Sequence, residues 1–324
     1  MTSSLTLLVD AATLYFRAYF GVPKTLTDQQ GRPVNALHGM LDMLTRLIGQ
    51  YSPTALVCCW DDDWRPAWRV DLVPSYKAHR VAEPAAVAAS PQSAAFPGTE
   101  IVDEELAQQV PWIADVLAAL GLCRVGAADH EADDVAGTLA RQLAAAGEQA
   151  IVVSGDRDLF QLVGERVRVA YIARGVARHE LVDDQWLLGR LGITGAQYAD
   201  FATLRGDSSD GLPGVPGIGE KTAANLLNTH GDLDGVLAAA QDPASAMPAR
   251  QRQRLLEATD YLARARVVVA TAQVELPQLD MALRPGRADL ARCAELADRH
   301  NCRGPVGRLL SALGEPHLPE VGDN

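Results

Sequence analysis

The run Gln149-Ala-Ile-Val-Val-Ser-Gly-Asp156 is a short, nearly continuous apolar stretch that closes on an aspartate. The same pattern occurs twice more, at 5–10 (Leu-Thr-Leu-Leu-Val-Asp) and at 54–61 (Thr-Ala-Leu-Val-Cys-Cys-Trp-Asp). Apolar runs of this kind are typical of parallel strands that are covered by helices on both faces. We therefore predict an α/β domain with a parallel central sheet. Because ligands gather where parallel strands end, the closing aspartate of each run is a candidate site residue.

Helical patterns alternate with these strands. They lie near 35–50, 103–120, 132–146 and 184–191, and from about residue 190 onward the pattern is wholly helical. The centre of that second part is the run from Asp207 to Thr222, where crowded Gly and Pro precede an Ala–Leu helix. This run predicts a tight hairpin between two helices. Residues 82–100 are dominated by Ala, Pro and Ser, which predicts either a mobile excursion or a linker.

The composition restricts the class of protein. The 324 residues carry 41 acidic and 29 basic side chains, and this net charge of −12 at first argues against a nucleic-acid partner. Nine of the acids fall in the motifs described below, which leaves −3 for the rest of the chain, and a cation bound among them would dominate the local charge. The five cysteines form no CxxC pair and predict small buried side chains in a reducing cytosol. We find no signal peptide and no apolar run of membrane-spanning length.

A cluster of acids opens one helical pattern at Glu131-Ala-Asp133-Asp134. A single acid there would only complement the positive end of the helix. Three acids within four residues repel one another, and a bound cation would relieve that repulsion.

Two further acidic pairs fit the same interpretation. If the chain stays extended, Asp156 and Asp158 lie on one side of it, although Gly-Asp pairs are also ordinary turn residues. Asp207 and Asp210 are three residues apart and would share one helical face. Mg²⁺ prefers carboxylate and water oxygens, and the chain lacks the His/Cys spacing of a zinc site. Two such cations, roughly 3.5–4 Å apart, serve phosphodiester hydrolysis well.

Basic residues accompany the acids. In Tyr76-Lys77-Ala-His-Arg80, a helix would place Lys77 and Arg80 on one face, where both could contact the scissile phosphate. Tyr76 would offer a stacking face to an unpaired base, and Arg17 would hold a neighbouring phosphate. The simpler interpretation of this stretch is a solvated basic turn.

The hairpin sequence from Gly214 to Gly219 predicts a second contact surface. Its glycines allow the backbone to approach another polymer closely, and the backbone N–H groups before a helix starting near Lys221 form an anion site. Such a surface would bind the backbone phosphates of a duplex without contacts to specific bases.

Together these motifs, from about residue 5 to about residue 310, closely resemble the bacterial 5′–3′ exonuclease and flap endonuclease family, which includes the N-terminal nuclease domain of DNA polymerase I. The resemblance implies a PIN-like nuclease domain over 1–188 with an arch region at 74–105. It also implies a helix–hairpin–helix (H3TH) DNA-binding domain over 189–290 and a C-terminal helical extension over 291–324. The expected activity is structure-specific cleavage of DNA near 5′ flaps, nicks and single/double-strand junctions in replication and repair.

The resemblance also assigns roles to residues. One group of metal ligands would be Asp10, Asp61, Glu131, Asp133 and Asp134, and the other would be Asp156, Asp158, Asp207 and Asp210. Lys77, Arg80 and Arg17 would act at the scissile phosphate. Duplex DNA would be bound by Gly214, Val215, Gly217, Ile218, Gly219, Lys221 and Thr222, with a K⁺ ion held by hairpin carbonyls. The expected cofactor is Mg²⁺ or Mn²⁺, and the expected protein is a stand-alone monomer in the bacterial cytoplasm, associated with the nucleoid.

The sequence departs from the family pattern at three places. Gly211 stands where the family usually has Asn, which predicts a looser second metal group. Asp62 is an alternative to Asp61 because the chain carries one extra residue before Trp68. The 82–100 segment is poor in the basic and aromatic residues of an arch, so strand threading stays open.

Two alternative functions are compatible with part of this pattern. A catalytically silent DNA-junction-binding protein would have the same fold, but such a protein would be expected to lose acids, and this chain keeps all nine. A PIN-type ribonuclease would depend on contacts to 2′-hydroxyl groups, for which the sequence shows no module.

Overall fold

A computed structural model of the chain describes residues 4–81 and 102–319. The Ala/Pro-rich segment at 82–100, and with it most of the expected arch, lies outside the described residues. None of the helices within the described ranges combines the length and apolar character needed to span a bilayer.

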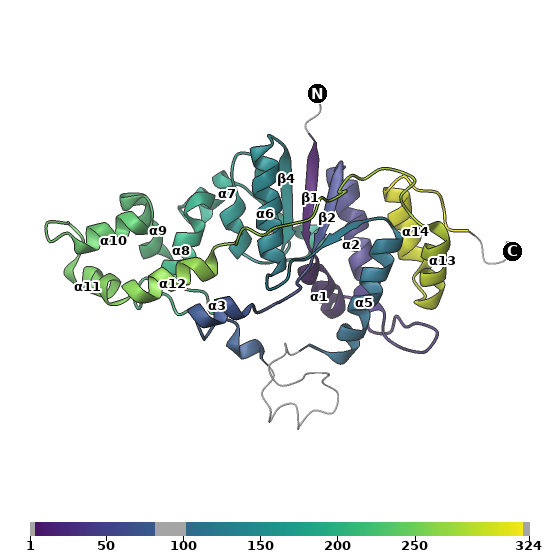
Figure 1. Cartoon of the computed structure of the whole chain (residues 1–324), viewed down its shortest axis with the longest axis horizontal. Helices are drawn as coiled ribbons and strands as arrows, with labels where there is room; N and C mark the ends of the chain where they lie inside the picture. The colour runs from purple at the N-terminus through teal and green to yellow at the C-terminus, as the bar shows by residue number, and fades with distance from the viewer. Residues whose placement is uncertain (1–3, 82–101, 320–324) are drawn as a thin grey trace, which may run out of the picture.

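A six-stranded sheet forms the centre of the molecule (Figure 1), with strand order β3-β2-β1-β4-β5-β6. The strands are β1 (Leu5–Asp10), β2 (Ala55–Cys59), β3 (Cys123–Val125), β4 (Gln149–Ser154), β5 (Val167–Tyr171) and β6 (Glu180–Val182). Every neighbouring pair is parallel except β5 and β6, which run antiparallel. The predicted parallel sheet is therefore confirmed, with one antiparallel strand added at its edge.

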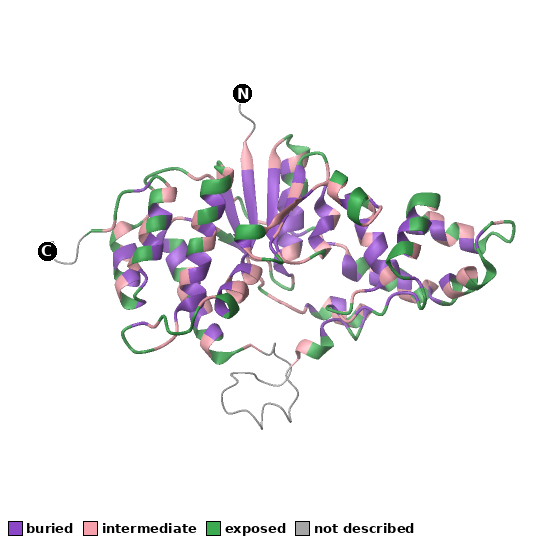
Figure 2. Cartoon of the chain, turned by 180° about the vertical axis from the view of Figure 1, so that it is seen from behind, coloured by how far each residue is buried: buried purple, intermediate pink, exposed green. Residues whose placement is uncertain are grey.

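The two faces of the sheet contribute to different cores. Along β1, Leu7 and Val9 pack into one hydrophobic cluster while Leu8 packs into the other. Adjacent Cys58 and Cys59 divide in the same way, as strand geometry requires. Figure 2 shows the central strands buried along most of their length. Burial on both faces explains why these strands are continuously apolar in sequence.

Helices from both ends of the chain cover one face of the sheet. They are α1 (Ala11–Gly21), α2 (Asn35–Tyr51), α5 (Glu104–Ala119), α13 (Leu290–Arg299) and α14 (Arg303–Ala312). Buried side chains of the last two, including Cys293 and Leu309, share a core with Leu37 and Leu41 of α2. The C-terminal helices thus complete the core of the α/β domain, beside α2 and α5 in Figure 1.

The other face is covered by α6 (Ala132–Ala145) and leads into the helical part of the chain. The helices of that part are α7 (Asp184–Arg190), α8 (Tyr198–Arg205), α9 (Glu220–His230), α10 (Leu233–Gln241), α11 (Ala249–Glu257) and α12 (Thr259–Val269). Short elements connect the layers: α3 (Ala67–Leu72) and the 3₁₀ helices η1 (Ala78–Arg80), η2 (Asp158–Leu162), η3 (Val176–Arg178) and η4 (Gly195–Gln197).

An extended segment after α12 returns the chain to the sheet. The Leu56 amide donates to the Met281 carbonyl at 2.9 Å, and the Leu283 amide donates to the Thr54 carbonyl at 2.8 Å. These bonds tie the helical part to the start of β2 before α13 begins.

Candidate active site

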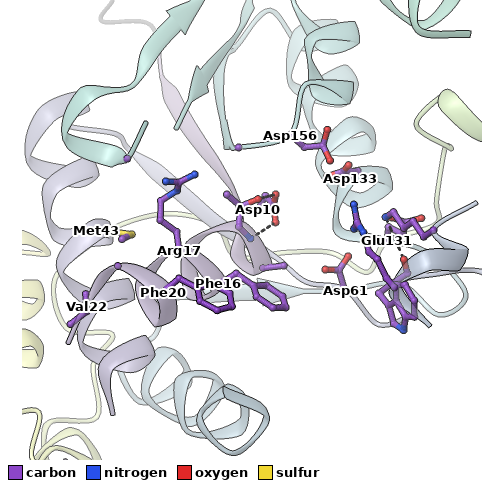
Figure 3. A pocket seen from close by; sticks show the side chains of 18 of the residues that line it. Asp10, Phe16, Arg17, Phe20, Val22, Met43, Asp61, Glu131, Asp133 and Asp156 are labelled. Carbon is purple, nitrogen blue, oxygen red and sulfur yellow. Dashed lines mark hydrogen bonds and ion pairs between the residues drawn. The ribbon is translucent and has the colours of Figure 1, made fainter. Parts of the chain in front are cut away.

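Carboxylates converge at the carboxyl ends of neighbouring strands. Asp10 is the last residue of β1, while Asp61 and Asp156 each follow the end of β2 or β4 by two residues. Because β2, β1 and β4 are adjacent in the sheet, the three side chains reach one cavity of about 860 Å³. Glu131 and Asp133, at the start of α6, line the same cavity (Figure 3). The structure therefore brings five of the nine predicted acids together.

Two of these carboxylates also organise the local backbone. Asp10 caps α1: its Oδ1 accepts from the Thr13 amide at 3.1 Å, and its Oδ2 accepts from the Ser154 hydroxyl at 2.7 Å and from the Thr13 hydroxyl. Asp61 Oδ1 accepts from the Ala132 amide at the start of α6, at 2.7 Å. Each carboxylate is thus held in place through one or both oxygens.

The buried carboxylates of the cavity raise one another's pKa. Burial, followed by the charge of Asp10, raises the pKa of Asp61 to about 7. Burial together with Asp156 and Asp10 raises the pKa of Asp133 well above its usual range. Such shifts mean that assembling these carboxylates in ionised form costs free energy, which a bound cation would offset.

The donor set fits a divalent cation. The Asp133 carboxylate accepts no hydrogen bond from the described residues. Asp158 Oδ1, which is outside the lining of this cavity, is also buried without a partner among them. Within residues 4–81 and 102–319, no three acidic, histidine or cysteine side chains come close enough to enclose an ion by themselves. Mg²⁺ typically keeps several waters and uses one or two carboxylates plus substrate phosphate, so the observed spacing suits that mode of binding.

The second predicted group of acids is only partly assembled. A second cavity of about 1010 Å³ shares Asp156 and Arg80 with the first and is also lined by Asp207. Neither Asp158 nor Asp210 lines either cavity.

Two conformational predictions for this second group were wrong. The chain does not stay extended after Asp156, because Asp158 opens η2 and its amide donates to Asp156 Oδ1 at 2.9 Å. Asp207 and Asp210 lie in a turn rather than on a helix: the Asp207 amide donates to the Leu212 carbonyl at 2.9 Å. Burial raises the pKa of Asp210 to about 6, against the opposing charge of Lys77.

Gly211 tightens this turn, contrary to the looser site expected from the sequence. Its φ is +71°, and a Cβ there would lie 2.1 Å from the Ser75 carbonyl oxygen. The close approach allows the Lys77 amide to donate to the Asp210 carbonyl at 2.9 Å.

Asp134 has a structural partner instead of a free carboxylate. It is fully buried, and Arg69 binds it through two bonds, of 2.8 Å to Oδ2 and 2.7 Å to Oδ1. The Ala272 amide adds a third bond at 2.7 Å. The predicted role of Asp134 as a metal ligand therefore does not fit, because its carboxylate lines neither cavity and its charge is already paired with Arg69. Sequence reasoning missed Arg69, whose partners lie far away in the chain.

The basic segment at 76–80 also differs from the prediction. Lys77 adopts the left-handed conformation (φ 47°) and precedes the single turn of η1, so it does not share a helix with Arg80. Tyr76 is only 4% exposed, and its hydroxyl donates to Glu131 Oε1 at 2.7 Å. A base cannot stack on a buried ring, so the predicted role of Tyr76 is wrong in this structure.

Lys77 and Arg80 nevertheless reach the cavity. Both side chains line it, Lys77 forms a buried ion pair with Glu131, and Arg80 pairs with Asp210 at 3.2 Å. The nearby acids raise the pKa of Lys77 above its usual range despite its burial, so it stays cationic. Between the two alternative aspartates, the structure favours Asp61: Asp62 is exposed and does not line the cavity.

The hairpin exposes backbone and one lysine. Val215 and Ile218 are 2% and 3% exposed, so their side chains are core positions and only their backbone could reach DNA. Gly217 and Gly219 are exposed, Gly214 is buried with its amide bound to the Tyr261 hydroxyl, Lys221 is exposed and Thr222 is half-buried.

Arg254 of α11 is a further basic residue beside the hairpin that the sequence did not single out. A Cβ at Gly217 would lie 1.9 Å from Arg254 Nη1. The signal was the arginine-rich sequence of α11, Ala249-Arg-Gln-Arg-Gln-Arg, in which five consecutive residues carry charged or amide side chains.

An α/β sheet with carboxylates at its strand ends, joined to a helical module, defines the class of PIN-like nuclease folds. The chain belongs to the 5′–3′ exonuclease family: residues 5–192 match its N-terminal resolvase-like domain, and residues 193–289 match its C-terminal SAM fold.

Among its relatives, the 5′–3′ exonuclease of Streptomyces coelicolor is 51% identical over 310 residues, which cover 95% of this chain and 99% of that protein. DNA polymerase I of Mycobacterium leprae is 33% identical over 99% of this chain and 33% of its own length. Among solved structures, the T5 D15 protein co-crystallised with metal ions has a TM-score of 0.64 at 16% identity, covering 96% of this chain and 99% of that one. At that identity the likeness shows the fold alone.

Proposed function

We propose that this protein is a divalent-cation-dependent DNA 5′ nuclease that cleaves phosphodiester bonds at flapped, nicked or junction 5′ ends. The observation that carries the proposal is the convergence of Asp10, Asp61, Glu131, Asp133 and Asp156 on one cavity that Lys77, Arg80 and Arg17 also line. Carboxylates bind the cations, and Lys77 and Arg80 bind the scissile phosphate.

The roles of the residues follow from their surroundings. When bound, Mg²⁺ or Mn²⁺ supplies an activated water and neutralises charge on the leaving oxygen. Asp133 and Asp61 have free oxygens at the cavity wall and are the best-placed ligands. Lys77 is held beside Glu131 as a fixed charge, which stabilises developing negative charge without reorganising. Arg80, which is about one-third exposed, can move between Asp210 and a phosphate.

The helical part would hold the duplex. The backbone at Gly217 and Gly219 is exposed just before α9, and Lys221 lies in the first turn of that helix. The N–H groups at the start of a helix favour a phosphate. Arg254 adds charge beside Gly217. We propose that a K⁺ ion bound by hairpin carbonyls contributes to this contact, and that the protein acts as a monomer. These contacts are to backbone phosphate and read no base. We propose DNA as the substrate because the relatives of this chain are named 5′–3′ exonuclease and DNA polymerase I.

Product mapping tests the proposal. The full chain is incubated with 5′-labelled flap, nicked and blunt DNA in Mg²⁺ or Mn²⁺, beside RNA flaps of the same sequence. We expect products cut at or next to the single/double-strand junction of DNA, and none from Asp156→Ala. Binding of flapped DNA without cleavage in either metal would instead support a silent junction-binding protein, and preferential cleavage of RNA would support a ribonuclease.

A further inference from the structure

The cavity that Asp10, Asp61 and Asp156 reach has two chemically different ends. Figure 3 shows Asp61, Asp133 and Asp156 on one side, Arg17, Val22 and Met43 on the other, and Asp10 between them. At the second end lie Arg17, Phe20, Val22 and Met43, and the cavity is also lined by Gly21, Gly175 and Arg178. No acid of the described residues belongs to this set. This end is therefore positive, whereas the carboxylate end is negative.

Arg17 lacks a partner for its charge. Its Nε is buried and has no hydrogen-bond partner among the described residues, and it forms no ion pair with any of them. The guanidinium lies near Gly155, since a Cβ there would come within 3.7 Å of Arg17 Nη2. An arginine nitrogen that is buried without an acceptor normally indicates a missing anion or water.

Arg178 lines the same cavity, and its backbone is held by the contact of η3 with α2. It is the last residue of η3, which packs on α2, the helix that also carries Met43. The next residue, His179, shares a short hydrogen bond with the Tyr51 hydroxyl of α2, and its other ring nitrogen bonds to the Val176 carbonyl at 2.7 Å. Arg178 itself is exposed and pairs with no acid in the described part of the chain.

We propose that Arg17 and Arg178 form a second phosphate subsite, which binds a substrate phosphate next to the scissile one. The proposal rests on the proposed nuclease function. Guanidinium groups bind phosphate oxygens bidentately, and two of them without a neighbouring acid suit an anion of high charge. Phe20, at 77% exposure, offers a face on which the attached base can stack. Arg178 is thus a specificity-determining residue for the phosphate near the 5′ end of the substrate.

The phosphate could come from two sources, an internal phosphodiester or a 5′-terminal monoester. The monoester carries more charge, so two arginines should favour it. Three DNA substrates distinguish the sources: a nicked duplex with a 5′-phosphate, the same duplex with a 5′-hydroxyl, and a short flap with a 5′-hydroxyl. If the subsite binds a terminal phosphate, Arg178 should affect KM only on the 5′-phosphate duplex. If it binds an internal phosphate, Arg178 should affect KM on the flap as well.

The variants are Arg178→Ala, Arg178→Lys and a matched control, Arg174→Ala. Arg174 is an exposed arginine four residues upstream that does not line the cavity. We expect Arg178→Ala to raise KM by roughly tenfold on the substrate that fills the subsite, with kcat little changed, because about one charge-assisted contact is lost. Arg178→Lys should recover part of the affinity, and Arg174→Ala should match the parent protein.

A binding measurement separates this proposal from the proposed function. Fluorescence anisotropy in EDTA compares binding of the 5′-phosphate and 5′-hydroxyl duplexes and of the flap without any cleavage. Weaker binding by Arg178→Ala, but not by Arg174→Ala, would support the subsite even if the parent protein cleaved nothing. Equal binding and equal KM for Arg178→Ala and the parent on all three substrates would overturn the subsite while leaving the nuclease function untouched.

Discussion

The buried contact between Arg69 and Asp134 gives a prediction of large effect. Arg69 is 3% exposed and Asp134 is fully buried. Besides Asp134, the guanidinium binds Glu131 Oε1 at 3.0 Å and the Val268 carbonyl at 3.1 Å, so one side chain joins α3, α6 and the end of α12. Arg69→Met would leave a buried carboxylate without its counter-charge.

The structure sets the size of that effect. Removing one partner of a buried pair typically costs about 3–5 kcal/mol, because the other charge stays buried without compensation. We expect Arg69→Met to lower the free energy of unfolding by this amount. Replacing both partners, as Arg69→Met with Asp134→Leu, should recover part of the loss, because no unpaired charge remains at position 134, although the Ala272 amide loses its acceptor.

Urea denaturation followed by circular dichroism measures these losses, with Arg65→Met as the matched control. Among the described residues, the side chain of Arg65 bonds only to the carbonyls of Tyr76 and Pro74, at 2.6 and 3.3 Å, so its loss leaves no buried charge without a partner. The control should lose about 1 kcal/mol. The reasoning would be refuted if Arg69→Met cost no more than the control, or if the double variant were less stable than the single one.

Three further predictions concern the site and the hairpin. Asp156→Ala should nearly abolish cleavage while DNA binding in EDTA stays within about threefold, since it removes a candidate ligand shared by both cavities; unchanged turnover would remove Asp156 from the metal site. Because the pKa of Asp61 in the folded chain is about 7, above the ordinary 3.8, its contribution to stability is present below pH 3.8 and lost as pH rises through 7. Mn²⁺ should therefore raise the melting temperature more at pH 8 than at pH 5.5 in scanning fluorimetry, and an equal rise at both would contradict this linkage. Gly217→Val should weaken duplex binding and flatten its salt dependence, because φ is +77° and the side chain would meet Arg254; an unchanged salt slope would remove the hairpin from the interface.

The sheet and its strand-end acids were predictable because they follow from local patterns. Continuous apolar runs indicated β1, β2 and β4, and the rule that ligands gather at strand ends picked out Asp10, Asp61 and Asp156. Neighbouring strands then bring these residues together without further information.

The predictions from sequence failed where contacts between distant parts of the chain determine the surroundings of a side chain. Asp134 was predicted to bind a cation, but its partner is Arg69. Tyr76 was predicted to stack on a base of DNA, but its partner is Glu131. Both partners lie more than fifty residues away in the sequence. Asp158 was misplaced because a single 3₁₀ turn changes the direction of its side chain. A helical hairpin of this size must also bury some of its apolar residues, which is why Ile218 packs inward although the motif as a whole faces outward.

The central claim is that Asp10, Asp61, Asp133 and Asp156 hold divalent cations beside the phosphate-binding side chains. The most direct measurement is a crystal of the full chain soaked in Mn²⁺, with ions located by anomalous scattering. The account predicts at least one strong peak within ligand distance of Asp133 and Asp156, completed by water. Peaks confined to surface acids, with this cavity holding only water at saturating Mn²⁺, would contradict it.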